Sequence, residues 1–142
     1  MNQIFQFVIV LGLFLIIDLP VILYLNKPMY QAQFARINKQ ETASGSKTRV
    51  WLSGVFAYLL LALGIYWFIV RPETESDNQI NYLNVALKGG LLGLVIYGIY
   101  NGTNMATINE WGTKEFFADT IWGTFLSGLI GLLSVYLINN FK

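Results

Sequence analysis

Residues 4–25 read IFQFVIVLGLFLIIDLPVILYL, and this apolar stretch sets the class of fold. Its single charged residue is Asp18. A helix of about 20 mostly apolar residues crosses a bilayer core of about 30 Å, so the stretch is long enough to span a membrane. No Lys or Arg precedes it and no small-residue cleavage pattern follows it, which distinguishes it from a secretory signal peptide. We therefore predict a retained membrane span.

Three further windows have the same character. Residues 50–70 carry no charge, residues 82–108 carry only Lys88, and residues 116–139 carry only Asp119. The chain is 12% charged, whereas soluble domains are about 25% charged. The prediction is an all-α polytopic membrane protein: one membrane domain over residues 1–142, folded as a four-transmembrane-helix bundle with spans at about 4–25, 50–70, 82–108 and 116–139.

The composition narrows the chemistry that this protein can perform. The chain has no cysteine and no histidine, which removes disulfides, thiolate nucleophiles, the commonest general base and the commonest metal ligand. No phosphate-binding loop, dinucleotide fingerprint or metalloprotease motif is present. The net charge of +1 gives no indication of a nucleic-acid partner. We expect no metal, no cofactor, no enzymatic activity and no nucleic-acid binding.

The basic residues predict an orientation. Six of them flank the first and third connections, against three on the other side: Lys27, Arg36, Lys39, Lys47, Arg49 and Lys114 against Arg71, Lys88 and Lys142. Positive charge is enriched in cytoplasmic loops. We expect the first and third loops in the cytoplasm and both termini on the opposite side.

The first loop is the longest. Within it Tyr30, Phe34 and Ile37 recur at helical spacing, which predicts a short helix lying in the membrane interface. Residues 40–47, rich in Ser, Thr and Gly, are expected to form an exposed flexible stretch.

Small residues recur along the third and fourth predicted spans. Because lipid tails are as apolar as leucine, membrane helices associate through close packing at small residues and through interhelical hydrogen bonds. We predict that these two spans are close neighbours, packed through Gly89, Gly93, Gly98 and Gly102 on one and Gly123, Ser127 and Gly131 on the other.

Polar residues from three separate regions are predicted to reach a similar depth in one leaflet. Ionisable groups within a membrane cost about 2.5–3.5 kcal/mol on insertion scales and are candidates for function. The candidate cluster comprises Asp18, Tyr97, Asn101, Thr103, Asn104, Thr107, Asp119 and Trp122. One interpretation is structural, with the amides and hydroxyls fixing the helix register. The other is a cavity for a small polar ligand, a lipid headgroup or a proton.

The chain resembles an uncharacterised family of small membrane proteins, the domain-of-unknown-function 2177 family. The resemblance extends over nearly the whole chain. It rests on these segments: Asp18-Leu19, Met29-Tyr30, Phe56-Ala57-Tyr58-Leu59-Leu60, Phe68-Ile69-Val70-Arg71-Pro72, residues 93–107, Trp111 and residues 119–124. It implies a four-helix membrane fold with no assigned activity.

Two departures from the family pattern stand out. The family typically has Tyr-Asp-Leu-Thr-Asn where this chain has Tyr100-Asn101-Gly102-Thr103-Asn104, so an amide replaces a carboxylate. It usually has a Trp soon after the first-span aspartate, where Pro20 and Val21 stand here. Relatives in large DNA viruses, which the resemblance also suggests, make a virion inner-membrane location an expectation.

Two functional hypotheses follow. The first is a structural or scaffold protein that packs laterally, or beneath a larger assembly such as a capsid, with other proteins of that assembly as partners. The alternative is a small-ligand, lipid or proton-handling protein that uses the intramembrane Asp/Asn cluster.

Overall fold

The computed structural model describes residues 1–37 and 47–141, which form helices joined by short connections. In chain order the elements are α1 (Gln3–Pro20), η1 (Val21–Leu25), α2 (Lys27–Ile37), α3 (Lys47–Ile65), η3 (Tyr66–Val70), α4 (Arg71–Glu75), α5 (Tyr82–Thr107) and α6 (Thr113–Asn140). Four segments are long and apolar enough to cross a membrane: Gln3–Leu25, Trp51–Glu75, Tyr82–Thr107 and Thr113–Asn140. The predicted all-α, four-span fold is confirmed, and the second span extends beyond its predicted end.

Two π-helical turns interrupt the first two spans, and both lie beside a proline. Pro20 ends α1 and precedes η1, while Pro72 follows η3 in the first turn of α4. Proline has no N–H to donate to the preceding turn, and a π turn is one way for a helix to continue past such a position. The chain therefore stays helical through both prolines. The first π turn lies directly after the turn that carries Asp18.

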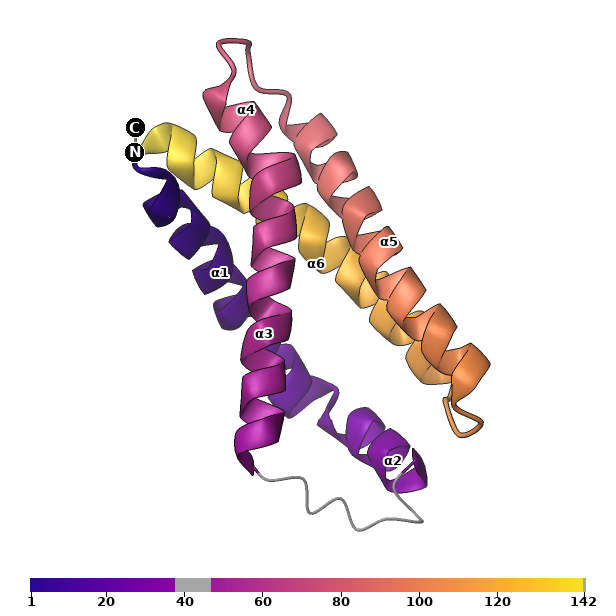
Figure 1. The fold of residues 1–142 in the computed structure, drawn as a ribbon. Coiled ribbons are helices and arrows are strands. Elements are labelled where there is room, and N and C mark those ends of the chain that lie inside the picture. Colours follow the sequence, from indigo (N-terminus) through magenta and orange to yellow (C-terminus); the bar gives the residue numbers. More distant parts are fainter. Residues whose placement is uncertain (38–46, 142) are drawn as a thin grey trace.

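The helices form a bundle with two polar ends. Both termini and the connection between α4 and α5 lie at one end, and α2 and the connection between α5 and α6 lie at the other (Figure 1). α5 and α6 form a long antiparallel hairpin, while α1 contacts both α3 and α6. The buried core lies where α1, α3 and α6 meet, and includes Val10, Phe14, Ile65, Leu126 and Ile130.

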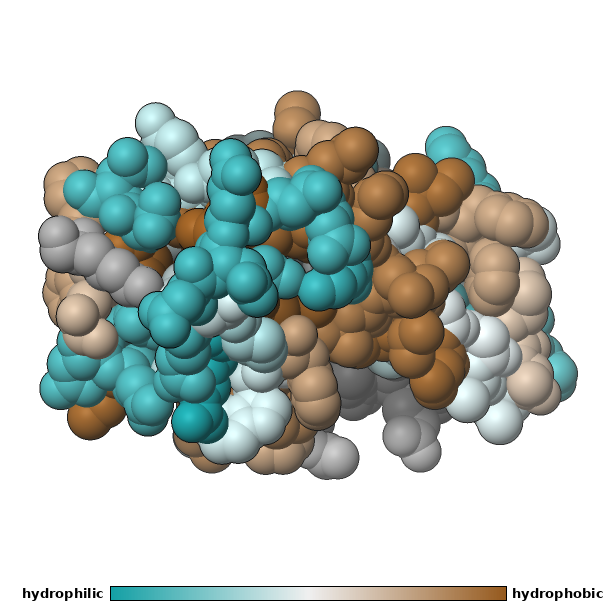
Figure 2. All heavy atoms as spheres, turned by 90° about the horizontal axis from the view of Figure 1, so that it is seen from above, coloured by the Kyte–Doolittle hydropathy of each residue, from teal (hydrophilic) through white to brown (hydrophobic). Residues whose placement is uncertain are grey.

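Seen from the end that carries the termini, hydrophilic residues gather over one part of the surface, and hydrophobic residues lie beside them (Figure 2). Exposed residues of the connection between α4 and α5, from Ser76 to Gln79, lie at this end. Two ion pairs also lie here: Lys88 Nζ to Glu73 Oε1 at 2.8 Å and Arg71 Nε to Glu75 Oε1 at 3.0 Å.

Small residues bring α5 and α6 into close contact. A Cβ added to Gly89 would lie 2.8 Å from the carbonyl oxygen of Ser127, and one added to Gly93 would lie 2.6 Å from that of Gly123. Gly131 packs near Ile69 of η3 and Val85 of α5. The seam therefore depends on the absence of side chains at these positions.

The prediction was wrong for Gly98 and Gly102, because a Cβ added to either would meet nothing within 4 Å among the described residues. At 100° per residue, Gly98 and Gly102 are turned about 140° and 180° from Gly93 around the helix axis. Positions four and eight residues after Gly93 continue its face instead, and these are Tyr97 and Asn101.

The first connection contains the predicted short helix, α2. Gln33 is only 2% exposed, so α2 buries a polar residue against the rest of the bundle. Its position in the membrane interface stays a prediction. The expected flexible stretch, residues 40–47, lies outside the described residues except for Lys47, which begins α3.

Candidate intramembrane carboxylate site

Asp18 is buried where α1, α3 and α6 meet. Its carboxylate accepts a hydrogen bond from the Tyr58 hydroxyl at 2.7 Å and another from the indole Nε1–H of Trp122 at 2.8 Å. Asp18 as a whole residue is only 3% exposed. Each oxygen of the carboxylate therefore has one donor, and the two donors come from different helices.

Asp119 has an equivalent arrangement on α6. Its Oδ1 accepts from the Tyr30 hydroxyl of α2 at 2.6 Å, and its Oδ2 accepts from Asn101 Nδ2 of α5 at 2.7 Å. Asn101 is fully buried, and its Nδ2 also donates to the carbonyl oxygen of Tyr97 at 3.0 Å. This second bond fixes the amide orientation, because it identifies the nitrogen as the atom that faces Asp119.

The four donors to the two aspartates within the described part of the chain are all neutral groups. Among the residues whose side chains are described, the ion pairs are Arg36–Glu115, Arg71–Glu75 and Lys88–Glu73, and none includes Asp18 or Asp119. The two carboxylates, hereafter the carboxylate pair, are thus hydrogen-bonded but lack a counter-charge within the described part of the chain.

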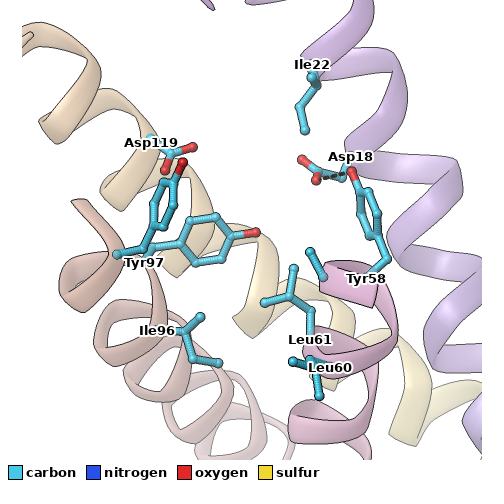
Figure 3. A pocket seen from close by; sticks show the side chains of 10 residues that line it. Asp18, Ile22, Tyr58, Leu60, Leu61, Ile96, Tyr97 and Asp119 are labelled. Atoms are coloured by element: carbon cyan, nitrogen blue, oxygen red, sulfur yellow. Dashed lines mark hydrogen bonds between the residues drawn. The ribbon is translucent and has the colours of Figure 1, made fainter. Parts of the chain in front are cut away.

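The carboxylate pair lines one cavity of about 570 Å³, hereafter the lateral cavity. Asp18 and Tyr58 lie on one side of it, and Asp119 and Tyr97 lie on the other (Figure 3). The remaining wall is largely apolar and comprises Ile22, Ala57, Leu60, Leu61, Ile96 and Tyr100. The site therefore combines two acidic groups and three tyrosines with a hydrocarbon surface.

The lateral cavity is lined in part by exposed residues of α3 and α5. Leu60 of α3 is 51% exposed and Tyr100 of α5 is 52% exposed, although both line the cavity. A molecule in the surrounding bilayer could reach the carboxylate pair between these two helices without crossing the bundle.

Tyr97 is positioned by a glycine on the neighbouring helix. Its ring occupies the space that a Cβ at Gly123 would need. Tyr97 lines the lateral cavity together with both aspartates. Gly123 therefore serves the site as well as the helix seam, since it lets an aromatic ring lie flat against α6 beside Asp119.

Two contacts hold α2 against α6 near Asp119. Besides the bond from Tyr30, Arg36 Nη2 of α2 pairs with Glu115 Oε1 at 2.7 Å, one helical turn before Asp119. Tyr30 lies outside the membrane-spanning segments. Burial and, after it, the hydrogen bond to Asp119 raise the pKa of its phenol above the ordinary value. Tyr30 therefore stays protonated and continues to donate a hydrogen bond to Asp119.

The structure brings together five of the eight residues named in the sequence-based cluster: Asp18, Tyr97, Asn101, Asp119 and Trp122. Thr103 and Thr107 do not belong, and their inclusion was wrong. Both are exposed, and their hydroxyls donate to carbonyl oxygens of their own helix at 2.8 Å. This local bonding is a common alternative for a threonine within a helix.

Asn104 also stands apart from the carboxylates. It is partly buried and contacts the Tyr100 hydroxyl, but within the described part of the chain no hydrogen bond joins its side chain to Asp18 or Asp119. The sequence reasoning missed Tyr30 and Tyr58 as donors. Their signal was a polar aromatic residue within or beside an apolar run, which also describes an ordinary membrane-interface tyrosine.

Fold and site together define a four-span membrane protein with an intramembrane carboxylate site. A family model, described as a predicted membrane protein (DUF2177), matches residues 3–136. The chain belongs to this family, as the resemblance in its sequence indicated. No curated protein and no solved structure matches the chain.

Proposed function

We propose that this membrane protein binds a small amphiphile with an ammonium headgroup in the lateral cavity. The observation that carries the proposal is the carboxylate pair: Asp18 of α1, which is buried, and Asp119 of α6, which is partly buried, face one cavity, and their described donors are all neutral. The proposal develops the ligand-binding hypothesis from the sequence and assigns binding without catalysis.

Charge compensation favours a cationic ligand. An ionised carboxylate within a bilayer is costly, and hydrogen bonds from neutral donors offset only part of that cost. An ammonium group between the two aspartates would supply both the missing charge and further hydrogen bonds. Tyr58, Tyr97 and Tyr100 add aromatic faces, which attract cations by about 0.5–2 kcal/mol each when suitably placed.

The rest of the cavity suits a hydrocarbon tail. Leu60, Leu61 and Ile96 contribute to its apolar wall. Leu60 of α3 and Tyr100 of α5, which also line the cavity, are each about half exposed. A volume of about 570 Å³ falls within the range of small-molecule sites. An amphiphile could therefore enter from the lipid with its headgroup at the aspartates and its tail along the apolar wall.

The experiment compares dodecylammonium, dodecanol and dodecanoate, which share a chain length and differ in headgroup. Thermal unfolding of the protein in a nonionic detergent is measured with each. We expect dodecylammonium to stabilise the protein, by about 2.7 kcal/mol at 100 times its Kd, and the other two to have little effect. The variants Asp18→Asn and Asp119→Asn should lose most of this response.

Asp77→Asn is the matched control, because Asp77 is an exposed acid in the connection between α4 and α5. It removes the same charge without touching the cavity and should respond like the wild type. Circular dichroism of each variant establishes that it is folded. Equal stabilisation by all three amphiphiles, or a full response in the Asp18→Asn/Asp119→Asn double variant, contradicts the proposal.

For orientation we propose that α2 and the connection between α5 and α6 face the cytoplasm. The excess of Lys and Arg beside these segments supports it. Because the chain has no cysteine, Ser76→Cys and Thr113→Cys can each be introduced singly. In right-side-out vesicles a membrane-impermeant maleimide should label Ser76→Cys and spare Thr113→Cys. The reverse pattern would invert the orientation.

A structural role is the second candidate, either lateral packing or a place in a larger assembly such as one at a virion membrane. A groove of about 410 Å³ between α1 and α3 supports it, because Leu15, Trp51 and Val55 line the groove and are exposed. Native mass spectrometry of protein extracted with its surrounding lipid tests this role. A defined complex with other proteins supports it, and a lone monomer counts against it.

A further inference from the structure

A second cavity adjoins the lateral cavity at Ile22, Tyr100 and Asp119, which line both. This cavity, hereafter the polar chamber, has a volume of about 470 Å³. Gln33 of α2, Asn101 of α5, Glu115 of α6 and Trp111 of the connection between α5 and α6 also line it. Asp18 is not among the described residues that line the chamber. The two aspartates therefore differ in what they can reach.

Three side chains that line the polar chamber carry a buried polar atom that has no hydrogen-bond partner among the described residues. These atoms are Gln33 Oε1, Asn101 Oδ1 and Trp111 Nε1. Gln33 is 2% exposed and Asn101 is fully buried. The assignment at Asn101 is secure, because its Nδ2 already donates to both Asp119 and the Tyr97 carbonyl, so the free atom is the oxygen.

Orphan atoms of this kind point to an occupant that hydrogen-bonds. A buried donor or acceptor without a partner costs about 1–3 kcal/mol, and an apolar occupant would leave that cost in place. Among the described residues, the chamber has two unpaired acceptors, Gln33 Oε1 and Asn101 Oδ1, and one unpaired donor, Trp111 Nε1. Water both donates and accepts, and a water molecule occupies only about 30 Å³ in the liquid, so the chamber has room for several.

We propose that the polar chamber is filled with water and gives Asp119 contact with the aqueous phase from the α2 end of the bundle. Asp119 then exchanges protons and counter-ions with that side, while Asp18 is reached through the lateral cavity. α2 covers the chamber and is held there by the Tyr30–Asp119 and Arg36–Glu115 contacts. This proposal rests on the chamber alone and does not depend on which amphiphile enters the lateral cavity.

Substituted-cysteine accessibility tests the proposal in the full-length chain, which has no cysteine of its own. The variants are Asn101→Cys and Gln33→Cys in the chamber, with Ser127→Cys as control. Ser127 is also fully buried with an unpartnered hydroxyl, but it lies in the seam beside Gly93. Each variant, in lipid nanodiscs, is treated with a small, water-soluble, cationic methanethiosulfonate, and the modification rate is followed by mass spectrometry.

A thiol reacts as its thiolate, and burial in apolar surroundings suppresses the thiolate. If the chamber holds water, Asn101→Cys and Gln33→Cys should react more than about tenfold faster than Ser127→Cys, as expected for a thiol pKa lower by one unit or more. Two chamber variants are used so that a folding defect in one leaves the other to decide. Rates equal to that of Ser127→Cys in the folded chamber variants would overturn the proposal.

Discussion

Gly93→Ala and Gly98→Ala form a matched pair that tests how α5 and α6 are held together. Both changes add one methyl group to the same helix, five residues apart. At Gly93 the added Cβ would lie 2.6 Å from the carbonyl oxygen of Gly123 and 2.6 Å from Ser127 Cβ and Oγ. At Gly98 it would meet nothing within 4 Å among the described residues. The geometry thus predicts opposite outcomes for the same chemical change.

The magnitude follows from two opposing effects. Replacing glycine by alanine within a helix stabilises it by about 0.8–1 kcal/mol in water. Forcing a methyl group into a packed interface costs about 1–3 kcal/mol, and here one obstacle is backbone that cannot rotate away. We expect Gly93→Ala to lower the free energy of unfolding by up to about 2 kcal/mol, and Gly98→Ala to leave it unchanged or raise it by up to about 1 kcal/mol.

The measurement is reversible unfolding in mixed micelles as the fraction of a denaturing detergent is raised, followed by circular dichroism. Gly93→Ala should unfold at a lower fraction of denaturing detergent than Gly98→Ala. If Gly93→Ala is as stable as Gly98→Ala, the close approach of α5 to α6 described here is incorrect, and the position of Tyr97 and Asn101 beside α6 would have to be revised.

Three further predictions concern the site. Tyr30→Phe leaves Asp119 with one donor fewer and should destabilise the protein by about 1–3 kcal/mol at neutral pH. Because the pKa of Tyr30 is raised in the folded protein, the wild type should lose stability above about pH 10, where the phenol ionises in the unfolded chain, and Tyr30→Phe should lose less. Unfolding scans at neutral and alkaline pH measure both proteins. An equal loss of stability in the two proteins would be contrary evidence. Arg36→Gln leaves the buried Glu115 without its partner. Since Arg36 is partly exposed, we expect the free energy of unfolding to fall by about 1–3 kcal/mol and proteolysis at α2 to become faster. An unchanged cleavage rate would argue against the Arg36–Glu115 pair as a contact that holds α2 in place. Thr103→Ala should not alter the response to dodecylammonium, because the Thr103 hydroxyl donates within its own helix, and a reduced response would place it in the site after all.

The fold was largely predictable because the apolar runs determine it. Length and hydropathy located all four spans, and the second span extends to Glu75 because η3 and α4 continue the helix past Pro72 into a charged turn. A window defined by the absence of charge necessarily ended before Arg71. The π turns beside Pro20 and Pro72 could not be predicted, since a proline in a helix permits a kink, a break or a π turn.

The site was predicted in part, for a reason of helix geometry. Tyr97 and Asn101 are four residues apart, a spacing that puts both on one face of a helix, and the structure joins that face to Asp119. Spacing alone could not predict that the Thr103 hydroxyl donates to a carbonyl oxygen of its own helix. It also did not predict that Gly98 lies on another face of α5 than Gly89 and Gly93, which contact α6. Tyr30 and Tyr58 were missed because their roles depend on how α2 and α3 pack against other helices, which a spacing pattern within one helix does not contain.

In the proposed function, Asp18 and Asp119 bind one headgroup from two sides of the lateral cavity. A double-mutant cycle measures this shared contact: dodecylammonium affinity is determined for the wild type, Asp18→Asn, Asp119→Asn and the double variant. If one headgroup contacts both carboxylates, the two losses in binding free energy should be non-additive, with a coupling of about 0.5–3 kcal/mol. Strictly additive losses, or an affinity that neither substitution changes, would contradict the claim.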